Sequence, residues 1–110
     1  MTNVKFLADS KGVYGFCVSG HSSKNCDDEF GKIVCSAVSS AVYMAANTVT
    51  DIVGDEADCD LDDGFMDFRV KNPSDSSYQV LAGLKLHLTE LSKQYSNNIK
   101  INGGAKDVKD

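Results

Sequence analysis

The chain has 110 residues, of which 42% are hydrophobic and 25% are charged, values that are ordinary for a globular protein with one domain. Its formal net charge is −5 and Arg69 is its only arginine, so we expect no direct binding to nucleic acids, which favour clustered Arg and Lys. The N-terminal segment MTNVKFLADSKG lacks the apolar stretch of a signal peptide, and no segment approaches the apolar length of a membrane span. We therefore expect a cytoplasmic protein that does not bind membranes and whose acidic surface attracts a basic partner.

The N-terminal part predicts a β-hairpin. Residues 3–8 (NVKFLA) alternate loosely, and residues 13–19 (VYGFCVS) are rich in β-branched and aromatic side chains, so both segments favour strands. Turn-forming residues stand between them at positions 9–12. Gly20 then breaks the second strand.

A polar loop and a long helix follow the hairpin. Residues 22–31 carry three acids and no apolar periodicity, which predicts a mobile loop. Residues 33–53 have apolar side chains at steps of three and four, and Gly54 ends the run. Because the first turns are apolar on more than one face, we expect this helix to be central and buried. Its predicted apolar stripe comprises Val34, Ala37, Val38, Ala41, Val42, Ala45, Val49, Ile52 and Val53.

The remaining chain predicts a second hairpin, a second helix and a short strand. Asp-Asp-Gly separates residues 57–61 from residues 65–71, and the alternation in FMDFRV puts Met66, Phe68 and Val70 on one inner face. A helix follows Pro73 and Ser74 and continues to about Tyr95. Its predicted apolar stripe comprises Val80, Leu81, Leu84, Leu88, Leu91 and Tyr95.

A final strand at residues 99–101 completes the order ββαββαβ. This order predicts an α+β fold with two main helices on a small mixed or antiparallel sheet. We expect a single domain over residues 1–103 and a disordered tail over residues 104–110.

Cys35 is the first candidate for chemistry among four cysteines, which we expect to be thiols in a reducing compartment. If the helix begins near Lys32 or Ile33, Cys35 lies in its first turn, where free amides and the helix dipole favour a thiolate. The same amides, including that of Ser36, could stabilise an oxyanion. The alternative is that Cys35 is a small buried core residue.

His21 is the second candidate, because the loop that follows it could return Cys35 to its side. A thiol and an imidazole from separate elements form the pair that nucleophilic catalysis needs. The alternatives are a surface histidine at a strand end, or a zinc site made from Cys17, His21, Cys26 and Cys35. No close cysteine pair is present, so we expect neither a metal nor another cofactor.

The segment SGH at positions 19–21, Phe30-Gly31 and IVCSAVSSAV at positions 33–42 resemble the bacterial ribosomal-processing cysteine proteases called Prp. The resemblance implies a small α/β sandwich that forms a homodimer. It implies an endopeptidase that trims a short N-terminal extension from large-subunit ribosomal protein twenty-seven. By position, Cys35 would be the nucleophile and His21 the base, with Gly20, Ser22, Gly31 and Ser36 at the oxyanion or substrate site.

One position departs from the family pattern. Many members carry an acid three residues before the cysteine, where this chain has Lys32. Either Asp27, Asp28 or Glu29 substitutes for that acid, or the site is a dyad. The alternative function is a catalytically inactive, ribosome-associated binding module with the same fold.

Overall fold

A computed structural model describes residues 1–20 and 29–103 of the chain. In chain order the elements are β1 (Thr2–Asp9), β2 (Gly12–Ser19), α1 (Glu29–Asn47), η2 (Thr48–Val53), β3 (Ala57–Asp62), β4 (Phe65–Val70), α2 (Asp75–Gln94) and β5 (Ile99–Gly103). The π-helical η2 continues α1 without a break, so the predicted order ββαββαβ is confirmed. The tail that we expect to be disordered, residues 104–110, lies outside the described part.

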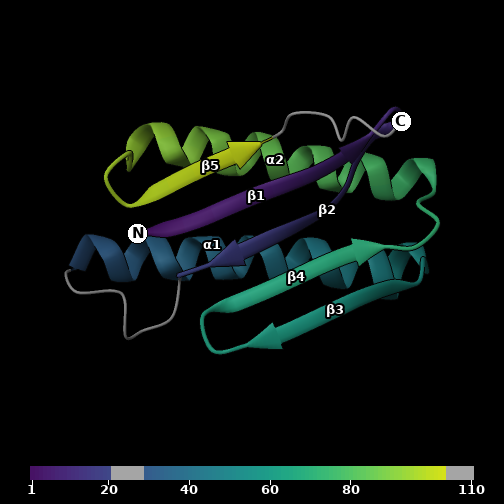
Figure 1. Cartoon of the computed structure of the whole chain (residues 1–110), viewed down its shortest axis with the longest axis horizontal. Coiled ribbons are helices and arrows are strands. Elements are labelled where there is room, and N and C mark those ends of the chain that lie inside the picture. Colours follow the sequence, from purple (N-terminus) through teal and green to yellow (C-terminus); the bar gives the residue numbers. More distant parts are fainter. Residues whose placement is uncertain (21–28, 104–110) are drawn as a thin grey trace.

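The described strands form one mixed sheet in the order β3-β4-β2-β1-β5 (Figure 1). The pairs β3–β4, β4–β2 and β2–β1 are antiparallel, whereas β1 and β5 are parallel. Helices α1 and α2 run side by side over one face of this sheet, and α2 packs against β2 and β5. The result is a two-layer α+β structure whose core lies between the helices and the sheet.

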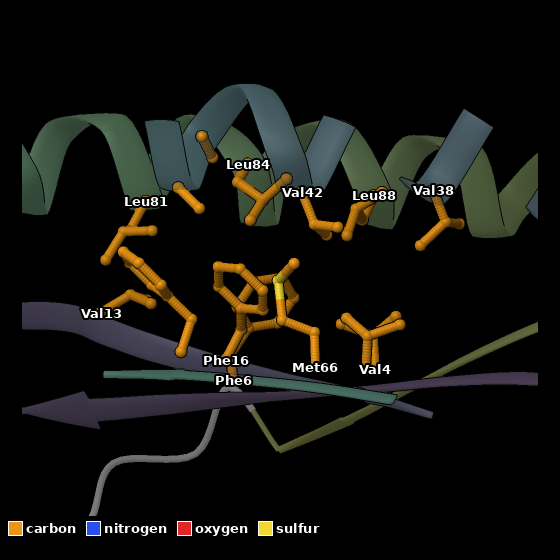
Figure 2. Packing of buried hydrophobic residues seen from close by; sticks show 14 of the residues in the cluster. Val4, Phe6, Val13, Phe16, Val38, Val42, Met66, Leu81, Leu84 and Leu88 are labelled. Carbon is orange, nitrogen blue, oxygen red and sulfur yellow. The ribbon is translucent and has the colours of Figure 1, made fainter. Parts of the chain in front are cut away.

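Alternation along the strands explains this core. Val4 and Phe6 of β1 and Phe16 of β2 point toward the helices (Figure 2). All three, and Val18 of β2, are almost completely buried. Valines of α1 and leucines of α2 meet them from the other layer. The predicted inner face of β4 is confirmed by the burial of Met66, Phe68 and Val70. The stripe predicted for the second helix is also confirmed, since its members are buried or pack against the core.

The first helix differs from its prediction in two ways. It begins at Glu29 instead of Ile33, so the last residues of the predicted loop are helical. It is also not central: Ile33 is 52% exposed and Ile52 is 80% exposed, although Ile52 belonged to the predicted stripe. The reason is that both helices lie on the same face of the sheet, which leaves their outer side uncovered.

The helical segment Glu29–Val53 is long and apolar enough to cross a membrane by length and composition, contrary to our expectation from the sequence. The core helix of a globular protein meets the same criterion. Here the face that carries Val34, Val38 and Val42 is buried against the sheet. We therefore interpret this segment as a core helix.

A carboxylate joins the end of η2 to the start of α2. Gly54 ends the helix with a φ of 89°, and the next residue, Asp55, turns back toward α2. Its Oδ2 accepts hydrogen bonds from Ser77 Oγ (2.6 Å), Ser74 Oγ (2.8 Å) and Ser74 N (2.9 Å). These bonds lower the pKa of Asp55 below its ordinary value, and the bond from Ser77 has the largest effect. The carboxylate thus ties the end of η2 to the start of α2.

Candidate active site

Cys35 lies on α1 beside the beginning of β1. Its side chain is half-buried, and its Sγ atom is 3.9 Å from Oγ1 of Thr2. Thr2 is the first residue of β1, is only 2% exposed, and shares the inward face of the strand with Val4. The sulfur therefore sits where the core meets the end of the sheet.

The sequence predicted that Cys35 lies in the first turn of its helix, but the structure places it further along. Because α1 begins at Glu29, Cys35 is the seventh residue of the helix. Only the first four N–H groups of an α-helix lack intrahelical acceptors, and the effect of the dipole fades within the first turn. The amides of Cys35 and Ser36 therefore belong to the helix interior, and other groups must favour a thiolate.

Cys35 is disulfide-bonded in this structure, which differs from the expectation that every cysteine is a thiol. Cys17 and Cys59 are free, so neither is its partner, and Cys26 lies outside the described residues. A disulfide sulfur carries no proton, so the Thr2 hydroxyl is the donor in the contact with Cys35. Nucleophilic attack requires the thiolate, and hence the reduced protein.

Gly20, directly after β2, makes the turn that leads to His21 in the sequence. Its φ is +78°, a conformation that side-chain-bearing residues rarely adopt, and an added Cβ would lie 2.6 Å from the carbonyl oxygen of Met1. Its N–H also donates to the carbonyl oxygen of Gly64 at 2.9 Å. Glycine at this position therefore lets the chain turn away from the sheet next to the N-terminus.

The end of β2 and Cys35 meet at one corner of the molecule. Asn3 pairs with Ser19 in the β1–β2 register, so the next step along both strands brings Thr2 beside Gly20. Thr2 in turn contacts the sulfur of Cys35. Figure 1 shows the beginning of α1 at the same end of the sheet as the beginning of β1. The residue that directly precedes His21 and the candidate nucleophile are therefore neighbours of the same threonine.

The other predicted site residues divide into two groups. His21 and Ser22 lie outside the described residues, as do Asp27 and Asp28. Gly31 is half-buried on α1, one turn before Cys35, and Ser36 is exposed directly after it. Lys32 and Glu29 are exposed on the same helix. The roles of Gly31 and Ser36 at the site therefore stay predictions, based on their positions in the sequence near Cys35.

Thr2 is the site residue that sequence reasoning missed. The sequence did contain a signal for it: Thr2 is a polar residue on the same strand face as Val4, Phe6 and Ala8, all of which are buried. A hydroxyl in that position must find a hydrogen-bond partner, because burying an unpaired polar group costs free energy. Its partner is the sulfur of Cys35.

The free thiols lie elsewhere and are poorly suited to nucleophilic attack. Cys17 points to the outer face of the sheet, where burial first and then the charge of Asp67 raise its pKa. Burial, Asp60 and Asp67 raise the pKa of Cys59 in the same way. Because Cys17 and Cys35 lie on opposite faces of the sheet, the zinc site considered from the sequence cannot include both.

The model of the family called Cysteine protease Prp matches residues 1–100. The chain belongs to the Prp cysteine protease family. The resemblance seen in the sequence is thereby confirmed, and Prp proteins are ribosomal processing proteases. No curated protein sequence matches the chain significantly.

Solved structures share the Prp fold of this chain over nearly its whole length. The essential ribosomal processing protease Prp from S. aureus, in complex with a substrate peptide, has a TM-score of 0.83 at 20% identity, covering 97% of this chain and 100% of the other. The same S. aureus protease with a covalently linked product peptide has a TM-score of 0.81 at 21% identity, with the same coverage. SMU.848 from Streptococcus mutans has a TM-score of 0.83 at 20% identity, covering 93% and 96%.

Proposed function

We propose that this protein is a cytoplasmic endopeptidase that removes a short N-terminal extension from large-subunit ribosomal protein twenty-seven during ribosome maturation. Its family membership supports hydrolysis through a cysteine. The observation that carries the residue assignment is the corner where Cys35 contacts Thr2 beside Gly20, because His21 is the next residue of the chain. The S. aureus complexes with substrate and product peptides support a polypeptide substrate.

In this proposal Cys35 and His21 form a catalytic dyad. His21 takes the proton of the reduced Cys35 thiol, and the thiolate attacks the scissile carbonyl carbon to give a tetrahedral intermediate. His21 then returns the proton to the leaving amine as the C–N bond breaks, which leaves a thioester on Cys35. Water, deprotonated by His21, hydrolyses the thioester and regenerates the thiol.

The groups around the sulfur have supporting roles. The hydroxyl of Thr2 donates to the thiolate and favours it over the thiol. The exposed Ser36 hydroxyl and the backbone at Gly20, Ser22 and Gly31 contact the substrate or its oxyanion. No cofactor or metal takes part in any step.

Without the acid that many family members carry, either Asp27, Asp28 or Glu29 orients His21 or the dyad acts without a third residue. Lys32 stands at that position, and its ammonium group, exposed one turn from Cys35, favours the thiolate electrostatically. Of these three acids, only Glu29 lies in the part of the chain that the structure describes, where it is exposed in the first turn of α1. The net charge of −5 attracts a basic ribosomal precursor.

Mass spectrometry of an extended ribosomal precursor tests this function. We expect wild-type protein, kept reduced, to cut the precursor once near its N-terminus, and Cys35→Ala to leave it intact. Cys17→Ala is the matched control, because it removes a thiol on the outer face of the sheet and should cut normally. Equal cleavage by the wild type and Cys35→Ala would remove Cys35 from the mechanism, and no cleavage by either would exclude this substrate.

The alternative function is a ribosome-associated binding module in which Lys32 marks a lost active site. Iodoacetamide alkylation of reduced protein separates the two, because Cys17 and Cys59 provide slow internal references with raised pKa values. We expect Cys35 to react about tenfold faster than either at neutral pH. A rate for Cys35 that does not exceed theirs would favour the binding module.

A further inference from the structure

The strand β3 leaves one side of the sheet open. It pairs with β4 on one side, and in the described part of the chain no strand covers the other side. An open edge offers N–H and C=O groups to an additional strand, a recurring mode of peptide recognition. Most of β3 is exposed, in contrast to the buried central strands.

The register fixes which backbone groups of β3 are available. Residues that hydrogen-bond to the partner alternate with residues that do not in an antiparallel pair. The bond from Lys71 N–H to the Glu56 carbonyl (2.9 Å) sets the phase of this alternation. Counting in steps of two from Glu56, the backbone groups of Asp58, Asp60 and Asp62 face β4. The groups that face the open edge therefore belong to Ala57, Cys59 and Leu61.

The two faces of β3 differ sharply in chemistry. Asp58, Asp60 and Asp62 lie on the face away from the helices, whereas Leu61 lies on the helix side and is 56% exposed. Asp58 has an exposed ion pair with Lys71 at 3.6 Å, and such pairs contribute little. Arg69 is engaged by the neighbouring Asp67 at 2.9 Å. The negative charge of the three aspartates of β3 is thus only weakly neutralised. The exposed apolar side chain of Leu61 lies on the other face of the same strand.

We propose that the open edge of β3 binds an extended segment of the substrate polypeptide whose side chains alternate between basic and apolar. Lysines or arginines of that segment lie opposite the aspartates, and its apolar side chains lie against Leu61. A second copy of β3 is a poor occupant, because pairing would set aspartate against aspartate. This inference rests on the proposed function, since it names the substrate as the occupant.

The position of β3 connects this docking edge to the candidate active site. The turn between β3 and β4 contains Gly64, whose carbonyl accepts the N–H of Gly20 at the end of β2. That turn lies at the same end of the sheet as the beginning of α1 (Figure 1). A segment bound along β3 therefore leads toward the corner that holds Cys35. Docking there raises substrate affinity and takes no part in bond cleavage.

Titration of the reduced wild-type protein with a fluorescent peptide of alternating Lys and Val tests the chemistry. We expect saturable binding that weakens about tenfold in Asp60→Asn/Asp62→Asn, because two cross-strand charge pairs are lost. Asp75→Asn/Glu90→Gln, which changes the same charge on α2, should bind like the wild type. A peptide of the same composition in two blocks should bind much more weakly. Equal binding of both peptides, or equal loss in both double variants, would overturn the proposal in favour of diffuse attraction.

Backbone pairing has its own test. N-methylation of alternate peptide residues removes the N–H groups that face β3 in one set and those that face away in the other. We expect one set to abolish binding and the other to preserve it. Cys59→Pro should weaken binding too, since it removes an outward N–H without breaking a bond to β4. Equal effects of the two methylation sets would exclude strand addition.

Cleavage kinetics separate this inference from the proposed function. Asp60→Asn/Asp62→Asn should raise KM for the ribosomal precursor about tenfold and leave kcat unchanged. If this variant cleaves with wild-type KM, the docking edge is wrong while the protease assignment stands. If the wild type cleaves no precursor but binds the alternating peptide through β3, the assignment of the substrate as its occupant fails with the proposed function.

Discussion

At the scale of single residues, the site depends on a contact between a buried hydroxyl and a sulfur. Thr2 is held by β1 at the end of the sheet, and Cys35 is held by α1 above it. Two rigid elements therefore fix the geometry, and neither side chain needs a loop to reach the other. This arrangement makes Thr2 a positioning residue for the proposed nucleophile.

Replacement of Thr2 tests this role. In reduced protein, Thr2→Val keeps the shape of the side chain but removes the donor, so we expect iodoacetamide to alkylate Cys35 about threefold more slowly at neutral pH. Thr2→Ser retains the hydroxyl and should restore the rate. If Thr2→Val and Thr2→Ser slowed the reaction equally, packing around the threonine would explain the effect.

At the scale of the elements, a carboxylate ties the end of η2 to the start of α2. Asp55 accepts three hydrogen bonds from Ser74 and Ser77, and Ser74 Oγ also accepts the N–H of Ser77 at 3.4 Å as the N-cap of α2. The three bonds are made to the ionised form of Asp55. Any stability that they provide must therefore depend on pH.

The stability of Asp55→Asn relative to the wild type tests this dependence. Because the folded pKa lies below the ordinary value of 3.8, the contribution is present above that pH and is lost as pH falls through the folded pKa. We expect Asp55→Asn to have the lower Tm at neutral pH, and the gap to narrow as the pH falls below the ordinary pKa of 3.8. Asp51→Asn, an equal charge change on exposed η2, serves as the control. A gap that stays constant with pH would show that the charge of Asp55 does not matter.

At the scale of the whole molecule, the two-layer arrangement leaves the outer side of both helices open. An apolar groove of about 700 Å³ runs between α1 and α2 and is lined in part by Ala37, Ala41, Val80 and Leu84. Met44 stands in this groove and is 67% exposed. We propose that the homodimer implied by the family resemblance forms across this surface.

Light scattering of purified variants tests the dimer. In the proposed dimer, Met44→Glu would bury an unpaired charge at the interface. We therefore expect this variant to be a monomer at micromolar concentration. Ile52→Glu places the same charge at another exposed apolar residue, outside the groove, and should leave the dimer intact. A wild type that is monomeric, or a Met44→Glu variant that remains dimeric, would contradict this interface.

The sequence determined most of the elements because each carried its own periodic signal. Alternation in FMDFRV identified the inner face of β4, and Asp-Gly identified the turn before it. The leucine spacing of the second helix likewise identified the residues that α2 buries. These signals are local, and the physical cause of each acts within a few residues of the chain. Cys35, His21 and Gly20 were named as site candidates from their residue types and the family resemblance, not from periodicity.

Only the tertiary structure decided how these elements surround the candidate site. The start of α1 at Glu29 has no apolar signal, so the sequence placed Cys35 too close to the helix end. Which face of that helix is covered depends on α2 lying beside it, and Ile52 is exposed for that reason. The partnership of Thr2 with Cys35 joins residues 33 positions apart. Contacts of that kind arise from packing between layers, which no local pattern specifies.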